Sequence, residues 1–214
     1  MAPPRSPLVD QSGRVLGPRA RGTRLRLLDA TAELLEKVKV RDLRVVDIAR
    51  AVETSPATFY QYFKDVEEVV LRLAEQASDE MPAVVEEIEG SWRDAQGLAR
   101  ARRIVDAFIR HWDRHQAVLR VRNLASDEGD RRFRAVRRKA LSPVIEALAR
   151  QIEAAREAGR VRGEIHPHAA AAAMAAILER LAAYHQELGA FGVTRDQLVE
   201  TSAHILHRTV TGRD

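Results

Sequence analysis

The sequence contains no cysteine, and this absence excludes several kinds of protein at once. Without thiols the chain cannot hold a disulfide framework, a cysteine zinc site, a thiolate iron-sulfur cluster or a cysteine nucleophile. Aromatic residues make up only 5% of the chain, and 11 glycines and 8 prolines are few for a β-sandwich, which needs frequent turns and aromatic or β-branched strands. We therefore expect an all-helical protein.

Long apolar runs are also absent. The longest, residues 169–178, is ten residues of mostly alanine, whereas a helix that spans a bilayer needs about 20. The first seven residues, MAPPRSP, lack the apolar core of a secretory signal. At 214 residues, 45% of them apolar, the chain is long enough for one or two folded domains. We expect a cytoplasmic protein that makes no membrane contact.

Positive charge is concentrated at the N-terminal end. Residues 1–64 contain 12 Lys and Arg against 7 Asp and Glu, a net charge of +5, although the whole chain carries only +4. This asymmetry is typical of a protein whose N-terminal part meets a polyanion such as nucleic acid or an anionic membrane. A solvated basic face is the alternative that charge alone leaves open.

Apolar residues recur at helical spacing along most of the chain. They predict a helix at 23–38, a short second helix at 45–52, and a third that begins at Pro56 after Ser55 as its N-cap. A fourth runs from 66 to about 82. Further helices are predicted at 92–115, 116–126, 131–158 (bent at Pro143), 168–188 and 195–209. The result is an all-α fold of about nine helices.

The second and third helices have the layout of a helix-turn-helix. The residues Asp47-Ile48-Ala49, Ser55, Thr58-Phe59-Tyr60 and Tyr62-Phe63 resemble, in identity and spacing, the DNA-binding domain of the TetR family of bacterial regulators. The resemblance covers residues 21–75 and beyond residue 80 extends only to architecture. It implies a helix-turn-helix domain at 21–66 and a ligand-binding and dimerisation domain at 67–214. Several prolines and glycines with little apolar periodicity predict a flexible basic arm at 1–20.

The resemblance also implies which residues meet DNA, since the third helix of such proteins lies in the major groove. Hydrogen bonds to bases would come from Thr58, Gln61 and Thr54, and contacts to thymine methyl groups from Pro56 and Ala57. Tyr60 and Tyr62 would lie against the sugar-phosphate backbone of the DNA. Arg44 and Lys64 would contact phosphates, and the arginines of the N-terminal arm would follow the DNA backbone or enter the minor groove. The DNA-binding set is Arg21, Arg24, Arg44, Thr54, Ser55, Pro56, Ala57, Thr58, Tyr60, Gln61, Tyr62 and Lys64, with Arg19 as a further arm residue.

The sequence departs from the family pattern at three positions. Glu53 stands where the turn usually has glycine, and its side chain disfavours a left-handed backbone and adds negative charge near DNA. Arg44 replaces the usual Ser or Thr at the start of the second helix. Val66 stands where the family commonly has a lysine, and we expect Lys64 to take the place of that lysine. These departures predict the same fold with altered contacts to the DNA phosphates.

By the same resemblance, the last two helices form a homodimer interface and the middle helices enclose an effector pocket. The alternative for both sets is ordinary core packing. The predicted interface consists of Ala172, Ala176, Leu181, Leu198, Ile205 and Leu206. The predicted pocket lining consists of Ile104, Phe108, Trp112, Leu119, Phe133, Leu148, Met174, Leu178 and Tyr184, which favours a small hydrophobic effector.

Two other groups of residues have the composition of binding sites. The basic residues between Arg131 and Lys139 suit an anionic ligand, but the favoured interpretation is a solvated face balanced by Asp127, Glu128 and Asp130. His111 and His115, and likewise His204 and His207, have spacings that a metal can use. No third ligand is evident beside either pair, so neither a metal site nor a cofactor is expected.

Together these features predict a ligand-responsive transcriptional repressor that binds a palindromic operator in double-stranded DNA as a homodimer and is released by its effector. An activator or a non-inducible regulator on the same fold is the alternative. A helical enzyme or a membrane-surface adaptor is a remote one. No set of nucleophile, base and orienting group is visible, so catalysis is not expected.

Overall fold

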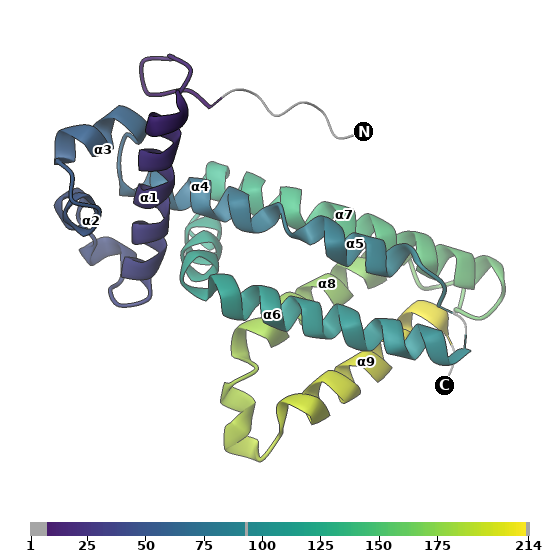
Figure 1. Ribbon diagram of the computed structural model, residues 1–214. Coiled ribbons are helices and arrows are strands. Elements are labelled where there is room, and N and C mark those ends of the chain that lie inside the picture. The colour runs from purple at the N-terminus through teal and green to yellow at the C-terminus, as the bar shows by residue number, and fades with distance from the viewer. Residues whose placement is uncertain (1–7, 93, 213–214) are drawn as a thin grey trace. The chain divides into compact units, whose positions relative to one another are not determined.

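A computed structural model describes residues 8–92 and 94–212 (Figure 1). Apart from one isolated bridge between Val9 and Val15, regular structure in these residues is helical, which confirms the predicted all-α fold. The α-helices are α1 (Pro18–Leu35), α2 (Val45–Ala51), α3 (Pro56–Tyr62), α4 (Val66–Ser78), α5 (Met81–Glu89), α6 (Asp94–Asp127), α7 (Arg131–Glu157), α8 (Pro167–Tyr184) and α9 (Arg195–Thr211), with 3₁₀ helices η1 (Val40–Asp42) and η2 (Glu187–Phe191). None of the helices searched over the described residues combines the length and apolar character that crossing a membrane requires.

Two helix boundaries differ from the sequence-based expectation. The predicted fourth helix, 66 to about 82, ends at Ser78 as α4, and α5, which was not predicted, follows at Met81–Glu89 with Pro82 in its first turn. The two helices predicted on either side of residue 115 are joined in α6, and His115 there has a non-helical backbone (φ −123°, ψ 16°). Pro143 lies inside α7, as expected.

The chain forms two compact units, and their division is not the predicted cut at residue 66. One unit contains the residues up to Gln76 together with 117–134, and the other contains 77–116 and 135 onward. The end of α6 and the start of α7 therefore belong with the helix-turn-helix. Local periodicity does not reveal this, because it reports which face of a helix is buried and not which unit buries it.

The core of the first unit is built from the helix-turn-helix and its neighbours. Ile48 and Ala49 of α2, and Phe59 of α3, have no exposed surface. Phe63, directly after α3, is equally buried, and its ring lies 5.6 Å from that of Phe59 between centroids. The small side chain of Ala49 lets α2 pack closely against α1 and α3. Further buried residues are Leu27, Leu28, Leu43, Val69 and Val70.

Residues 8–17 form a defined turn instead of the predicted flexible arm; residues 1–7 lie outside the described part. The Asp10 carboxylate accepts hydrogen bonds from the main-chain N–H groups of Ser12 and Arg14. Gln11 attaches the turn to the end of α3, because its main-chain N–H donates to the carbonyl of Gln61 (3.0 Å). Its side chain donates to the Tyr62 carbonyl and to Glu68.

The beginning of α7 is joined to α4 within the same unit. Asp130 accepts a hydrogen bond from the main-chain N–H of Arg132 (2.7 Å), and the Arg132 guanidinium contacts both Asp130 and Glu67. The side-chain hydrogen bond from Arg132 lowers the pKa of Asp130 to about 2. In the second unit, Arg137 pairs with Glu179. These two members of the 131–139 basic cluster are thus engaged in ion pairs, in line with the charge-balanced interpretation.

The second unit contains the larger core. Ile104 and Ile109 of α6, and Leu148 and Ile152 of α7, have no exposed surface. Ala171 and Ala203 carry this burial into α8 and α9. Ion pairs join α6 to the C-terminal helix at Arg102 with Glu200 and at Asp106 with Arg195. Exposed pairs of this kind contribute little because water screens them, so apolar burial determines the stability of this unit.

The glycine at position 97 of α6 permits a close backbone approach. A Cβ atom there would overlap the main-chain carbonyl of Trp92 and lie 2.8 Å from Nε2 of His207. At Gly22 of α1, in contrast, a Cβ would meet nothing within 4 Å. The two helical glycines therefore differ in what an added methyl group would do.

We expect Gly97→Ala to lower the free energy of unfolding by at least about 1 kcal/mol, because overpacking against main chain outweighs the helical preference of alanine. Gly22→Ala, the matched control, should raise it by up to about 1 kcal/mol. Chemical denaturation followed by circular dichroism measures both. Equal effects of the two substitutions would show that position 97 is not tightly packed.

Candidate DNA interface and ligand pocket

The short helix α3 is held in place by a cap at its beginning and by apolar burial along one side. The main-chain N–H of Thr58 donates to Oγ of Ser55 (3.2 Å), and Pro56 occupies the first turn. Phe59 points inward and is fully buried. A helix of seven residues is not stable alone in water, so this packing fixes its orientation. The predicted N-cap and start of the helix are confirmed.

The opposite side of α3 is open to solvent. Pro56, Ala57 and Gln61 are exposed, and Tyr60 retains 52% of its surface although it directly follows the buried Phe59. Thr54, Thr58 and Tyr62 are half-buried, and the Thr58 hydroxyl lies 3.1 Å from that of Ser55. Gln61 is therefore the predicted base-contacting side chain that is both exposed and rich in hydrogen-bonding groups.

Three of the predicted phosphate contacts lie on the surface of the first unit. Arg21, Arg44 and Lys64 are exposed. Arg44 is the N-cap residue of α2 and makes no side-chain cap hydrogen bond. The main-chain N–H of Lys64 donates to Glu68 (2.7 Å), which fixes the backbone at this lysine. Positively charged side chains are thus present at the entrance of α2 and at the exit of α3.

Arg24 is placed differently from the prediction. Only 9% of its surface is exposed, and its guanidinium lies over the Phe63 ring, 5.1 Å from the centroid. Burial is the main cause that lowers its pKa, followed by the nearby positive charge of Arg72. Arg24 therefore makes a cation–π contact inside the first unit, and its predicted contact with DNA stays a prediction.

The turn between α2 and α3 requires the conformation that its sequence disfavours. Glu53 has φ 56°, and among the described residues it is the one non-glycine residue with a positive φ. A side chain in this region costs about 1–2 kcal/mol. Two interactions after Glu53 stabilise the turn. The main-chain N–H of Thr54 donates to the Ala49 carbonyl (2.9 Å), and Ser55 caps α3.

The predicted dimer residues fall into two groups. Ala172, Ala176 and Ile205 are exposed, and Leu181 is half-buried. Leu198 and Leu206, in contrast, are 7% and 1% exposed, so they pack in the core of their own chain and are not available to a partner. Helical spacing identified α8 and α9 as apolar but did not show which of their faces the rest of the chain covers. Other exposed apolar residues in this region are Ile177, Tyr184 and Phe191.

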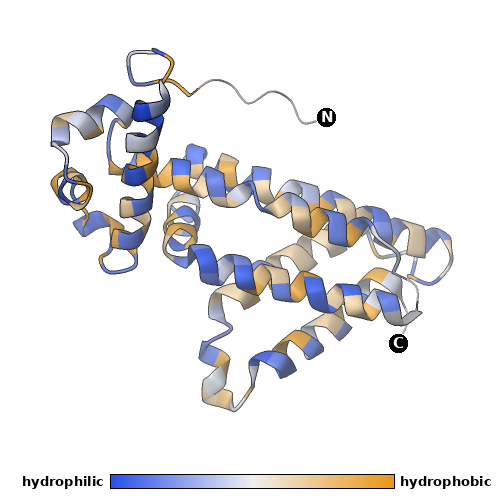
Figure 2. Cartoon of the chain, viewed as in Figure 1, coloured by the Kyte–Doolittle hydropathy of each residue, from blue (hydrophilic) through white to orange (hydrophobic). Residues whose placement is uncertain are grey.

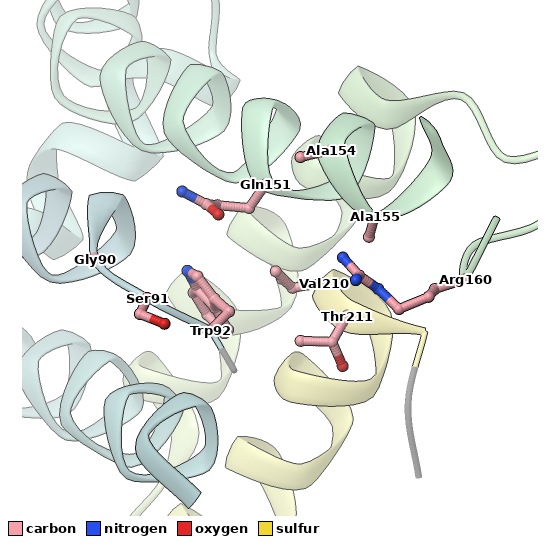
Figure 3. A pocket seen from close by; sticks show the side chains of 9 residues that line it. All are labelled: Gly90, Ser91, Trp92, Gln151, Ala154, Ala155, Arg160, Val210 and Thr211. Atoms are coloured by element: carbon pink, nitrogen blue, oxygen red, sulfur yellow. The ribbon is translucent and has the colours of Figure 1, made fainter. Parts of the chain in front are cut away.

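A pocket of about 190 Å³ lies in the second unit (Figure 3). The indole of Trp92 and the guanidinium of Arg160 lie on opposite sides of Val210 in this view. Gln151 contributes an amide from α7, and the Trp92 indole N–H donates to the Ile88 carbonyl (2.7 Å). The remaining lining residues are Gly90, Ser91, Ala154, Ala155 and Thr211. The pocket therefore combines apolar side chains with the Arg160 guanidinium, the Gln151 amide and the hydroxyl-bearing residues Ser91 and Thr211.

None of the nine predicted lining residues belongs to this pocket. Most of them are buried in the second unit, whereas Leu119 and Phe133 belong to the first. Tyr184 is 39% exposed, with the Arg180 guanidinium 4.2 Å from its ring centroid. Their contact with an effector stays a prediction. Apolar periodicity missed the actual lining because turn residues and the last turn of α9 contribute much of it.

The structure supplies the third ligand that the sequence lacked beside His111 and His115. The carboxylate of Glu80, the N-cap residue of α5, lies 3.5 Å from Nδ1 of His111 and 2.8 Å from Nε2 of His115. It is separated from them by more than thirty residues, and no sequence spacing links the three. The expectation that neither histidine pair has a third ligand is therefore wrong for this pair.

Comparisons with known proteins agree with this architecture. Residues 84–214 match the family profile described as tetracyclin repressor-like, C-terminal domain, and residues 27–73 match that of bacterial regulatory proteins, tetR family. No sequence among curated proteins matches the chain. A capped, outward-facing third helix and a separate helical unit with a pocket define a DNA-binding transcriptional regulator with a ligand-binding domain. The chain belongs to the TetR family.

Solved structures share the fold at low sequence identity. The fatty acid degradation regulator FadR from Bacillus halodurans has a TM-score of 0.65 and 16% identity over 90% of this chain and 96% of its own. PfmR from Thermus thermophilus has a TM-score of 0.59 and 19% identity over 88% and 99%. FadR from Bacillus subtilis, solved in complex with stearoyl-CoA, has a TM-score of 0.62 and 15% identity over 89% and 99%.

We predict that Glu53→Gly raises the free energy of unfolding by about 0.5–1 kcal/mol, because relief of the left-handed strain exceeds the added entropy of the unfolded chain. Glu53→Gln removes the same charge and keeps the strain, so its stability should stay near that of the wild type. Urea denaturation of both variants measures the difference. Equal stability of the two variants would contradict the account of the turn.

Proposed function

We propose that the protein is a homodimeric transcriptional repressor that binds a palindromic operator and is released by a small, mainly hydrophobic effector. Its site of action would be the bacterial cytoplasm, on the nucleoid. The observation that carries the proposal is the two-sided character of α3. Its inner side is sealed by Phe59, and its outer side presents Ala57, Tyr60 and Gln61 to solvent.

DNA recognition would divide between the groove and the backbone. Gln61 has the amide donor and acceptor pair that suits the edge of adenine, and Pro56 and Ala57 offer apolar contact to thymine methyl groups. Tyr60 and Tyr62 would lie on sugar and phosphate. Arg44, Lys64 and Arg21 would supply the charge that gives affinity without sequence preference. With so few base-reading groups, phosphate contacts would provide much of the binding energy.

A homodimer supports two-fold recognition, since two third helices about 34 Å apart read successive major grooves on one side of the duplex. The exposed apolar residues of α8 support this assembly. Ala172 and Ala176 have small side chains that permit close helix packing, and Ile177 is 47% exposed. Ile205 of α9 is 49% exposed. Figure 2 shows hydrophobic residues along α8.

The pocket beside Trp92 supports a ligand with an apolar body and a polar end. At about 190 Å³ it is smaller than typical ligand sites of about 300–1,000 Å³, so it would hold a small molecule or one end of a longer one. Arg160 and Gln151 would bind oxygen atoms of that ligand. Release from DNA would require the ligand to favour the conformation that binds DNA poorly. Fatty acids and acyl-CoA esters are suitable first ligands to screen.

We predict that the protein binds a fragment upstream of its own or a neighbouring gene with an affinity that falls steeply with salt. Tyr60→Ala and Gln61→Ala should each weaken binding by roughly tenfold, because each removes one good contact worth about 1–3 kcal/mol. Lys64→Ala should reduce the slope of log affinity against log salt by about 1. Fluorescence anisotropy at several salt concentrations measures these effects.

Arg162→Ala is the matched control for Lys64→Ala, since Arg162 is an exposed cation in the second unit, outside the helix-turn-helix. Its affinity and salt slope should equal those of the wild type. Circular dichroism establishes that each variant is folded. Unchanged affinity in both Tyr60→Ala and Gln61→Ala would count against α3 as the reading helix.

We predict that Ala176→Arg combined with Ile205→Arg converts the protein from dimer to monomer, because two buried cations per chain would face their copies without partners. Analytical ultracentrifugation gives the mass in solution. Leu25→Arg is the control, since Leu25 is an equally exposed leucine (49%) on α1 and should leave the dimer intact. A wild-type protein that sediments as a monomer would refute the proposed assembly.

A further inference from the structure

We infer that Glu80, His111 and His115 form a binding site for a divalent transition metal ion, with Zn²⁺ as the probe that suits it best. One ligand atom from each residue lies within 4.8 Å of the other two. The inference concerns the second unit alone and does not depend on DNA binding.

The helical spacing of the two histidines places both rings on one side of α6. Positions i and i+4 are neighbours on a helix surface, and the two ring centroids are 5.1 Å apart. Nδ1 of His111 and Nε2 of His115 both face the Glu80 carboxylate, at 3.5 Å and 2.8 Å. In a tetrahedral zinc site with bonds of about 2.0–2.1 Å, ligand atoms are roughly 3.3 Å apart. The two nitrogen-to-carboxylate separations, each to a different oxygen of Glu80, lie within about 0.5 Å of that value, and all three ligand atoms lie within 4.8 Å of one another.

The local backbone at Glu80 and at His115 is consistent with contact between the carboxylate and the imidazole. Glu80 is the N-cap residue of α5, yet its side chain makes no cap hydrogen bond and extends to the histidines instead. His115 departs from helical geometry inside α6. The histidine side chains are 12% and 23% exposed, so the site is sheltered but still reached by solvent. A water molecule would complete the coordination.

The residue types favour zinc and its neighbours in the transition series over magnesium or calcium. Imidazole nitrogen suits Zn²⁺, Ni²⁺, Co²⁺ and Cu²⁺, whereas Mg²⁺ and Ca²⁺ prefer oxygen ligands. A metal ion would also join α5 to α6. Arg114 competes with it, because its guanidinium lies 2.9 Å from the Glu80 carboxylate. Arg114 is 63% exposed and is free to turn into solvent when the metal binds.

The site is tested by Zn²⁺ binding to the tag-free, full-length protein in competition with a chromophoric chelator. We expect one Zn²⁺ per chain, and a loss of affinity of at least about tenfold in His115→Gln and in Glu80→Gln. Arg114→Ala should bind Zn²⁺ more tightly than the wild type, because it frees the carboxylate. Zn²⁺ should raise Tm in the wild type and in Arg114→Ala, but not in His115→Gln or Glu80→Gln.

His168→Gln and His204→Gln are matched controls, since each of these histidines contacts a single glutamate, Glu146 or Glu200, at 3.3 Å or 3.0 Å. Both should bind Zn²⁺ like the wild type. If the wild type binds no Zn²⁺, Glu80 and its neighbours form an ion-pair network only. Equal affinity in wild type, His115→Gln and Glu80→Gln would locate the metal elsewhere. Either result overturns the inference, and the gain of affinity in Arg114→Ala keeps it testable should the other variants fail to fold.

Discussion

The burial of Phe59 is the interaction on which the DNA-binding surface depends. A helix as short as α3 has no orientation of its own, and Phe59 fixes one by filling the space beside Ile48 and Ala49. Because neighbouring positions on a helix point in different directions, the inward Phe59 leaves Tyr60 facing outward. Phe63 is buried at the end of the helix, and the Arg24 guanidinium lies over its ring. A single apolar contact thus determines which side chains DNA would meet.

In the proposed function the second unit holds an effector pocket and provides a surface for a copy of itself, and its helices would divide these tasks by face. The inner residues of α8 and α9, such as Ala171 and Leu206, are fully or almost fully buried. The outer residues, such as Ala176 and Ile205, remain uncovered in the single chain. Large apolar residues on an open surface mark interaction sites when they gather on one element. The proposed dimer follows from this division of faces.

Much of the fold was predictable because local chemistry determines it. The Ser55-Pro56 pair marks the start of α3, and the apolar residues at helical spacing, with few aromatic residues, indicate helices throughout. The left-handed turn at Glu53 was indicated only by the resemblance, since the family usually has glycine there, and the glutamate itself disfavours that backbone. Tertiary facts were not predictable: the burial of Arg24 depends on Phe63, and the contact between Glu80 and His115 depends on how α5 meets α6. Leu198 and Ala172 look alike in periodicity, and only packing separates core from surface.

The most direct test of the central claim is a hydroxyl-radical footprint of the wild-type protein on the DNA upstream of its own and adjacent genes. The account predicts two protected segments with related inverted sequences, centred one helical turn apart or a multiple of it, which fade as salt is raised. Protection at a single segment without inverted symmetry would contradict two-fold recognition by α3. Protection that is uniform along the DNA would contradict a sequence-reading role for this helix.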